Sequence, residues 1–546
     1  MSGALDSLII TAKTSLPEIL DSFRDATKDL LLIDERTVIT DPHLELLTDY
    51  PRSSSAALVA IVKNGNTLVR QNRIASASSA SHKVTVGNRD FVGALRLSQK
   101  QREEIISALE NAISFKAKGN ALDLLLVALA RAMVKVDAVD LLSAPWSRSD
   151  DPSERERVKQ EIAGMNIATL RLKMANRAND GFFSVFFLRK FSKILTWVAV
   201  KVGATPNQVT LLSFAIGLYS AYSFSRGTFL SILLGAFLLQ LSIIVDCVDG
   251  ELARYTRKFS KLGAWLDAVT DRVKEYLVFL GLAYGASLEG RELWIPAMAM
   301  MVIQTFRHLS DYNFAQSVKI RAEDKFKTPI EFMAEFDGIV PTEREPKGRL
   351  RYWLGKMIQF PIGERWLVIS ASAVIGGAAF TFTIMPILAF ISAVFVFRGR
   401  FRRTREMEKV SLKSALIVNQ SDLLGIKESF TKRASWIEPS VLRLLEALIL
   451  IAFFVQQDLL GIPSFIILFS IIFHHYDNLY RALQNERKPI WLSALGFYLG
   501  GRILLIGVAL LAGVDIALIA WYFAIIFLGV SSIQWVIAHK QNRIQK

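Results

Sequence analysis

The chain has 546 residues, of which 52% are hydrophobic and 21% charged, and its formal net charge is +15 at pH 7. Many apolar runs are long enough to span a bilayer at about 20 residues each, which excludes a purely soluble protein. The single cysteine excludes an internal disulfide, and the pattern of basic residues favours anionic headgroups over nucleic acid as partners.

Residues 1–150 contain short apolar segments between polar turns, which predicts a soluble α/β domain. A capping box of Ser98 and Gln101 predicts a helix to about Phe115, and Asn120 is expected to cap a second helix to about Val134. Strands are expected at Leu8–Thr11, Leu30–Ile33, Ala57–Val62, Val84–Val86 and Val92–Leu97.

Asp34 and Glu35 follow the second of these strands. The two carboxylates could hold a metal, but an acidic pair suits a solvated turn at the end of a strand at least as well.

Residues 151–202 are predicted to connect this domain to the membrane. The charged stretch 151–180 alternates glutamate and arginine, which is typical of a solvated helical connector. Residues 182–202 mix apolar side chains with Arg189, Lys190, Lys193 and Lys201, which predicts an amphipathic helix at the membrane interface. The alternative is an ordinary helix packed on the first domain.

Apolar runs dominate the rest of the chain and predict a polytopic helical membrane protein. The fifth and sixth runs are expected to separate at Pro386. The candidate spans are 207–225, 228–247, 263–287, 293–310, 365–384, 386–399, 438–456, 462–482, 490–512 and 514–537.

Four aspartates lie at or near the ends of the second and third spans. On helices, Asp246 and Asp249 share one face and Asp267 and Asp271 share another, so two facing helices would bring the four carboxylates together. Ionisable groups near a bilayer are costly unless they bind ions, face a polar cavity or pair. Like charges at this density require protons or cations among them, and all-oxygen ligation suits Mg²⁺ or Mn²⁺. The alternative is a packing cluster with salt bridges to Arg254, Arg257 or Arg272.

The complete pattern is Asp246-x2-Asp249-Gly250-x2-Ala253-Arg254-x8-Gly263-x3-Asp267-x3-Asp271. It resembles the signature of the CDP-alcohol phosphotransferase family, and all eight specified residues are present. The upstream segment Thr205-Pro206-Asn207-Gln208-Val209-Thr210 resembles the opening of the first membrane helix in this family. The resemblance covers roughly residues 180–400 and implies a six-helix membrane domain, placed at 203–405.

The resemblance also implies roles for these residues. Asp246, Asp249 and Asp267 would ligate the metal, and Asp271 would both contribute to the metal site and accept the proton of the attacking hydroxyl. Nucleotide contacts are expected from the small residues and polar side chains nearby: Gly250, Ala253, Arg254 and Asn207.

Family members transfer a substituted phosphate from a CDP-linked donor to an alcohol and release CMP, which implies a role in phospholipid or polyol-phosphate biosynthesis. The donor is expected to be CDP-diacylglycerol or a soluble CDP-alcohol, and the acceptor an inositol phosphate or a similar polyol phosphate, with glycerol phosphate as the alternative. Arg307 and Arg365 are candidate acceptor contacts, although arginines are common at membrane interfaces without such a role. Family members often pair as homodimers. A different class, a transporter or binding scaffold with a cation site, remains the alternative.

The order of the domains resembles the bifunctional inositol-phosphate cytidylyltransferase and di-myo-inositol-phosphate phosphate synthase family, which joins a nucleotidyltransferase half to a membrane half. A working nucleotidyltransferase would have a glycine-rich basic loop after its first strand, but this chain has Ala12-Lys13-Thr14-Ser15. The sequence therefore favours a degenerate N-terminal domain that binds or regulates over an active cytidylyltransferase.

Basic residues predict the orientation, because lysine and arginine concentrate in cytoplasmic loops. They place both termini and the acidic motif on the cytoplasmic side of the cell membrane. The basic residues follow every second span: Arg257, Lys258 and Lys261; Lys319 to Arg351; Arg398 to Arg405; Arg481, Arg487 and Lys488; Lys540, Arg543 and Lys546.

Residues 406–546 add four spans that the family core does not require, and their role is left open by the sequence. His474, Asp477 and Arg481 share one helical face, which leaves a metal site or structural hydrogen bonding as alternatives. Arg443, Glu446 and Arg502 are expected to pair between helices.

Overall fold

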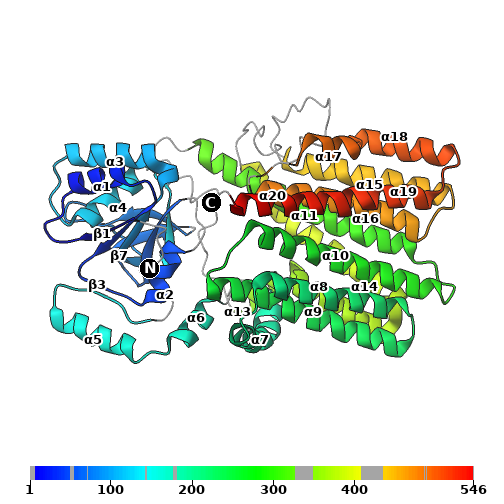
Figure 1. Ribbon diagram of the computed structural model, residues 1–546, viewed down its shortest axis with the longest axis horizontal. Helices are drawn as coiled ribbons and strands as arrows, with labels where there is room; N and C mark the ends of the chain where they lie inside the picture. The colour runs from blue at the N-terminus through cyan, green and yellow to red at the C-terminus, as the bar shows by residue number, and fades with distance from the viewer. Residues whose placement is uncertain are drawn as a thin grey trace. The chain divides into compact units, whose positions relative to one another are not determined.

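The computed structural model describes residues 6–49, 54–70, 72–141, 144–175, 181–325, 349–406, 435–484, 486 and 488–544. The chain divides into two compact units (Figure 1). The N-terminal unit contains Met1–Ala175, and the helical unit contains Asn176–Asp324 and Glu343–Lys546. The basic loop predicted after the fourth span and the start of the region from 406 lie largely outside the described residues.

The N-terminal unit is built on a mixed seven-stranded sheet with the order β1-β2-β7-β4-β8-β6-β5. Strands β1 and β2 are parallel, as are β4 and β8, whereas β7 is antiparallel to both β2 and β4. The strands are β1 (Asp6–Ile10), β2 (Leu30–Asp34), β4 (Ser55–Ile61), β5 (Thr67–Arg70), β6 (Arg73–Ala77), β7 (Arg89–Leu97) and β8 (Val136–Asp140). A separate pair, β3 (Thr37–Val38) and β9 (Ser147–Arg148), forms a second sheet.

Helices cover both faces of the large sheet, because its central strands bury side chains on both sides. Leu32 packs with α1 (Leu16–Asp25), α3 (Arg102–Ser114) and α4 (Ala121–Arg131), whereas its neighbour Leu31 points to the other face and packs with α2 (Asp41–Thr48). The predicted α/β fold of this region is therefore confirmed. The connector forms α5 (Pro152–Ala163) and α6 (Ile167–Ala175), which belong to this unit, and Arg171 of α6 pairs with Glu45 of α2.

The predicted strands correspond to β1, β2, β4 and β7 except for one. The prediction of a strand at Val84–Val86 is wrong, since this segment lies in the loop before β7 and Val86 is 70% exposed. The hairpin of β5 and β6 forms the edge of the sheet next to β8. Its polar sequence gives little indication of a strand.

One of the two predicted helix caps is confirmed. Asn120 accepts hydrogen bonds from the backbone N–H groups of Leu122 and Asp123. The capping box of Ser98 and Gln101 is wrong, because Ser98 makes no side-chain cap bond and the Gln101 carbonyl accepts from Ser55 of β4. Gln101 therefore bonds to a residue of a distant strand and not to the backbone at Ser98.

The helical unit begins with π-helical η2 (Ser184–Leu188) and α7 (Arg189–Lys201), and its other described residues are mostly helical. Helix α8 starts at Pro206 with Thr205 and Gln208 as a capping box. The further helices are α8 (Pro206–Ser225), α9 (Phe229–Thr256), α10 (Lys261–Ser287), α11 (Trp294–Lys325), α13 (Arg349–Ile358), α14 (Ile362–Glu406), α15 (Glu438–Gln456), α16 (Ile462–Leu483), α17 (Ile490–Leu495), α18 (Tyr498–Leu511), α19 (Ile516–Phe523), π-helical η5 (Ala524–Val530) and α20 (Ser531–Ile544).

Helix α8 of this unit buries small and polar residues and exposes large apolar residues. On α8, Ser213, Gly217 and Ser220 are buried, while Leu211, Leu212 and Tyr222 are more than half exposed. Such an arrangement is unstable in water but suits lipid. Four helical segments among the described residues are long and apolar enough to cross a membrane: Phe229–Thr256, Ile362–Arg405, Ile490–Leu511 and Ile516–His539. The chain is a multi-pass membrane protein.

Two breaks differ from the predicted boundaries. Pro386 lies inside α14, and the non-helical residues are Gly376 and Gly377, the second with φ +69°, which glycine adopts readily. These glycines line a cavity with Gly227 and Glu289, so the break lies beside the α8–α9 and α10–α11 loops. The predicted span 490–512 is divided into α17 and α18 at Gly496 and Phe497.

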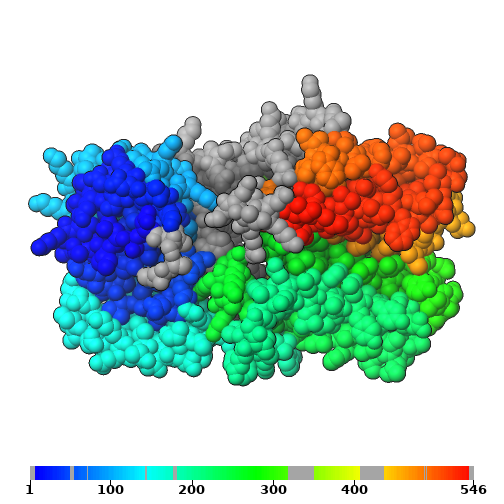
Figure 2. Space-filling model, in the orientation of Figure 1, coloured from blue at the N-terminus to red at the C-terminus, as the bar shows by residue number. Residues whose placement is uncertain are grey.

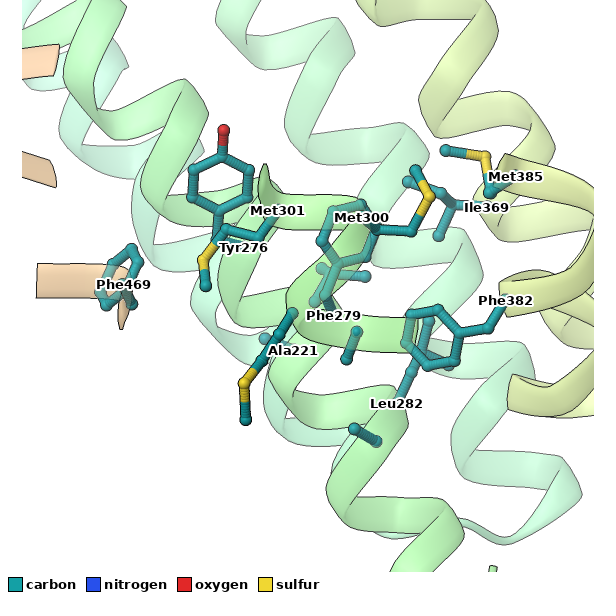
Figure 3. Packing of buried hydrophobic residues seen from close by; sticks show 14 of the residues in the cluster. Ala221, Tyr276, Phe279, Leu282, Met300, Met301, Ile369, Phe382, Met385 and Phe469 are labelled. Carbon is teal, nitrogen blue, oxygen red and sulfur yellow. The ribbon is translucent and has the colours of Figure 1, made fainter. Parts of the chain in front are cut away.

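A single apolar cluster joins helices α10, α11 and α14 to helices α15 and α16 of the C-terminal region. Figure 3 shows Tyr276 and Phe279 of α10 beside Met300 and Met301 of α11 and Phe382 of α14. Phe469 of α16 belongs to the same cluster. The surfaces of the green and the orange to red helices meet along this unit in Figure 2.

Candidate active site

The acidic motif occupies two helices that are joined by a tight turn. Helix α9 ends at Thr256, and Arg257 adopts a left-handed conformation with φ +57°. Ser260 then caps α10 by accepting a hydrogen bond from the N–H of Gly263 at 2.9 Å. This turn sets the last turns of α9 against the first turns of α10, and so places Asp246 and Asp249 opposite Asp267 and Asp271.

The structure brings three of the aspartates together closely. Carboxylate oxygens of Asp246, Asp267 and Asp271 all lie within 4.8 Å of one another. The carboxylate of Asp249 lines the same cavity and accepts a hydrogen bond from the Thr210 hydroxyl of α8 at 2.5 Å. All four aspartates line this one cavity.

A cavity of about 410 Å³ opens over the four aspartates. Its remaining polar lining includes Arg189, Arg254, Lys356 and Gln359. A set of four carboxylates fits the oxygen preference of Mg²⁺ or Mn²⁺. The positive side chains in this lining suit an anionic substrate.

Lys274 is a basic residue of the site that the motif does not contain. Its ammonium group donates to Asp246 at 2.7 Å and to the Ser213 hydroxyl at 2.9 Å, and it lies 3.0 Å from Asp271. The side chain is fully buried, and Gly217 of α8 leaves room for it, because a Cβ there would lie 2.6 Å from the lysine stem. The helical spacing from Asp267 and Asp271 could have identified Lys274 on the same face of α10.

Glu251, directly after the motif glycine, holds α7 against α9. It accepts hydrogen bonds from Arg189 at 2.7 Å, Ser192 at 2.8 Å and Thr196 at 2.6 Å, and all four side chains are buried. Helix α7 therefore turns its polar side inward. Its outer side carries exposed apolar residues: Phe191, Ile194, Trp197 and Val198.

Two of the four predicted nucleotide contacts line the cavity, and the other two do not. Gly250 and Arg254 line the cavity, and a Cβ at Gly250 would lie 3.2 Å from the Arg254 guanidinium. Ala253 and Asn207, both described, are not part of this lining. The Asn207 side chain lies against Gly263, where a Cβ would come within 2.7 Å of its oxygen, so Gly263 allows α8 to approach α10 closely.

The two candidate acceptor contacts lie beside the cavity rather than in its described lining. Arg365 donates to both carboxylate oxygens of Glu275, at 2.8 and 3.0 Å. Arg307 donates to the backbone carbonyl of Phe360 at 3.4 Å, and Arg365 donates to the same carbonyl at 3.2 Å. Both arginines are buried. Their role as acceptor contacts stays a prediction.

The polar cluster of the C-terminal region is paired within the protein. Asp477 accepts from Arg481 at 2.8 Å and lies 2.7 Å from the Lys488 ammonium. His475 and Arg502 both bond to Glu446, at 2.9 and 2.8 Å. The predicted pairing of Glu446 with Arg502 is confirmed, and these contacts favour structural hydrogen bonding over a metal site.

Comparison with known proteins identifies the part of the chain that carries the acidic site. Residues 203–341 match the family described as CDP-alcohol phosphatidyltransferase. These residues form a CDP-alcohol phosphatidyltransferase domain. Proteins with such domains generally depend on a divalent metal, which agrees with the acidic cluster. The alternative of a transporter or scaffold is not favoured.

Two of the following relatives of the chain are named as inositol phosphate synthases. A bifunctional IPC transferase and DIPP synthase of Thermococcus kodakarensis is 32% identical over 173 residues, which are 32% of this chain and 37% of that protein. An archaetidylinositol phosphate synthase of Pyrococcus horikoshii is 37% identical over 84 residues, 15% of this chain and 43% of that protein. A phosphatidylinositol phosphate synthase of Mycobacterium tuberculosis is 30% identical over 137 residues, 24% of this chain and 59% of that protein.

These matches are partial. The chain spans between 23% and 37% of the length of the bifunctional relatives that it matches. Residues 367–545 match a family of unknown function, DUF5941. The domain match ends at residue 341, so the predicted continuation of the six-helix core to 405 stays a prediction.

Proposed function

We propose that the chain is an integral membrane transferase that moves a substituted phosphate group from a CDP-linked donor to an alcohol and releases CMP. The main support is the convergence of the motif carboxylates in one cavity inside a CDP-alcohol phosphatidyltransferase domain. A cluster of this kind near a membrane is costly unless its members bind ions, face a polar cavity or pair, and here all four carboxylates line one cavity.

The chain's own residues divide the work of this reaction. Asp246, Asp249, Asp267 and Asp271 would hold Mg²⁺ or Mn²⁺, which supplies positive charge to the donor diphosphate and to the departing CMP. Arg254 binds the diphosphate through its planar fork of donors. The acceptor hydroxyl oxygen forms the new bond to phosphorus, the bond from phosphorus to the CMP oxygen breaks, and the Asp271 carboxylate receives the hydroxyl proton.

An inositol phosphate or a similar polyol phosphate is the acceptor that we favour. The names of the relatives support it, since they include archaetidylinositol phosphate and phosphatidylinositol phosphate synthases. The donor is CDP-diacylglycerol or a soluble CDP-alcohol. Glycerol phosphate is the competing acceptor, and a panel of donor and acceptor pairs separates the alternatives.

CMP release by the full-length protein in liposomes tests the proposal. Removal of divalent metal with a chelator should abolish release, and Mg²⁺ or Mn²⁺ should restore it. Asp271→Asn should lower the rate by about 100-fold or more, because general bases contribute about 10² to 10⁴. Glu289→Gln, at an exposed acid beyond the end of α10, is the matched control and should keep the full rate. Release that persists without metal, or an unaffected Asp271→Asn variant, would refute this function.

For the N-terminal unit we propose a binding or regulatory role without cytidylyltransferase activity. The segment after β1 is held by local bonds between Thr11 and Thr14 and leads directly into α1, which Ser15 caps. Asp34 is paired with Arg36 and Arg148 rather than left open for a metal. Pyrophosphate release from CTP and an inositol phosphate by the full chain would overturn this proposal.

A further inference from the structure

Helix α10 has two faces with different partners. Asp267, Asp271 and Lys274 are spaced four and three residues apart and face α9. Trp265, Val269 and Tyr276 lie on the opposite side of the helix and pack against the C-terminal region, with Trp265 and Val269 in one cluster that also contains Phe473 of α16 and Trp535 of α20. The metal-ligand candidates therefore sit on a helix whose other side is fixed by the region from 435 onward.

A buried hydrogen bond forms the polar part of this contact. Trp265 lies two residues before Asp267 in the chain. Its indole N–H donates a hydrogen bond to the Asp477 carboxylate of α16 at 2.9 Å. The Asp477 carboxylate is itself fixed by Arg481 at 2.8 Å and by Lys488 at 2.7 Å. Ser531 of α20 also donates to it, and Arg481 donates to the Ser531 carbonyl at 2.7 Å. Trp265 thus bonds to an acceptor held rigidly by several C-terminal elements.

A second bond lies three turns further along α10. The hydroxyl groups of Tyr276 and Tyr476 of α16 are 3.1 Å apart, and both side chains are buried. The two bonds flank the segment that carries Asp267 and Asp271. They fix both the axial position and the rotation of α10, on which the separation of the carboxylates depends.

We propose that the C-terminal helices act as a positioning element for the acidic site, with Asp477 as a positioning residue that acts through Trp265. This inference rests on the proposed function and assigns a role to the region that matches only a family of unknown function. Residues that orient metal ligands from behind commonly change metal affinity when they are lost.

Binding of Mn²⁺ to the full-length protein in detergent, followed by electron paramagnetic resonance, tests the inference without relying on turnover. Trp265→Phe removes the donor and keeps an aromatic ring in the pocket. We expect it to weaken Mn²⁺ binding about three- to tenfold, less than the about 10- to 100-fold found for partners bonded directly to a metal ligand. Saturating Mn²⁺ should restore the rate of CMP release, because the chemical groups are intact.

Trp535→Phe is the matched control. Trp535 is 1% exposed and packs 6.1 Å from the Trp265 ring, but its indole nitrogen has no hydrogen-bond partner among the described residues. This variant should bind Mn²⁺ as the unmodified protein does. Equal affinity for Trp265→Phe and the unmodified protein would overturn the inference, as would an equal loss in both variants.

Two further variants keep the outcome clear. If Trp265→Phe does not fold, Tyr476→Phe cuts the second bond and should weaken Mn²⁺ binding at least twofold, and unchanged binding would overturn the inference. Asp271→Asn separates the two levels of proposal. If it binds Mn²⁺ normally, the proposed site fails, and if it alone loses affinity while Trp265→Phe does not, only the positioning role fails.

Discussion

Lys274 supplies a buried positive charge between Asp246 and Asp271. Lys274→Met keeps much of the side-chain volume but leaves the carboxylates to repel one another. We expect the metal-depleted variant to melt at a lower temperature than the unmodified protein, and Mn²⁺ to raise its melting temperature by the larger amount. Thermal unfolding in detergent measures both shifts.

The control for this substitution is Lys258→Met, at an exposed lysine in the turn between α9 and α10. Mn²⁺ should raise the melting temperature of this variant by the same amount as that of the unmodified protein. An equal shift in Lys274→Met would show that the lysine does not balance the charge of the acids.

Asp34 carries a pH-dependent part of the stability of the N-terminal unit. Burial alone would raise the pKa of this carboxyl, but hydrogen bonds from Arg36 and the charge of Arg148 lower it from 3.8 to about 2. A lowered folded-state pKa stabilises the fold above about pH 4, by about 2 kcal/mol for this shift, and the contribution disappears as the pH falls toward 2.

The Asp34→Asn variant should therefore lower the free energy of unfolding of the N-terminal unit by about 2 kcal/mol at pH 7, and by progressively less below pH 4. Calorimetry of the full-length protein between pH 3 and pH 7 measures the difference. Asp25→Asn, at an exposed acid of the same unit, should leave the transition unchanged. A deficit for Asp34→Asn that does not shrink in acid would contradict the assignment.

The acidic residues of the site could be predicted from the sequence, but their partners could not. The spacing of Asp246, Asp249, Asp267 and Asp271 is a local property of two helices, and the structure brings their carboxylates to one cavity. The pairing of Arg365 with Glu275, in contrast, depends on how α14 packs on α10. Contacts of that kind join residues far apart in the chain, and a single sequence carries no signal for them.

Helices α8 and α10 approach closely because α10 has a glycine at their contact. A Cβ at Gly281 of α10 would lie 2.3 Å from the backbone carbonyl oxygen of Ala221 on α8, so a side chain there must push the helices apart. We expect Gly281→Ala to lower the free energy of unfolding by about 1–3 kcal/mol. A lower melting temperature in detergent would report it.

Gly507→Ala provides the matched comparison. Gly507 lies in α18 with open space around the position of a Cβ, and alanine favours helix over glycine by about 1 kcal/mol. This variant should be neutral or slightly more stable. If both substitutions lower the free energy of unfolding equally, close packing of α8 and α10 does not explain the glycine at position 281.

Most helices were predictable because each needs only a long apolar run, whereas the breaks within them were not. Proline is the stronger local signal, yet Pro386 is accommodated inside α14 and the break occurs at Gly376 and Gly377. The sheet shows the same limit. The hairpin of β5 and β6 is stabilised by pairing with β7 and β8, and not by its own sequence.

The predicted orientation of the protein in the membrane can be tested directly. Cys247 is the single cysteine, so Cys247→Ser gives a background for single-cysteine labelling. Cysteines placed at Lys258, in the α9–α10 turn, and at Glu292, in the α10–α11 loop, lie at opposite ends of α10. In intact cells a membrane-impermeant maleimide should label position 292 alone, because basic loops stay cytoplasmic. Labelling of position 258 alone would reverse the orientation.

The membrane character, the α/β unit and the family domain all follow from features that a sequence displays openly: apolar runs, short strands between turns and a spaced motif. The role of the C-terminal region did not follow, because its connection to the site is made by Trp265 and Asp477, 212 residues apart. The homodimer that the resemblance implies stays a prediction.

Helix α7 places a practical limit on handling the protein. Its inner side satisfies the buried charge of Glu251, and its outer side is a stripe of aromatic and branched residues that water does not solvate well. Delipidation would therefore expose this stripe to water and, through Glu251, disturb the adjoining metal-ligand candidates of α9. Preparations stripped of lipid should lose metal binding at the acidic cavity while the long helices are still folded.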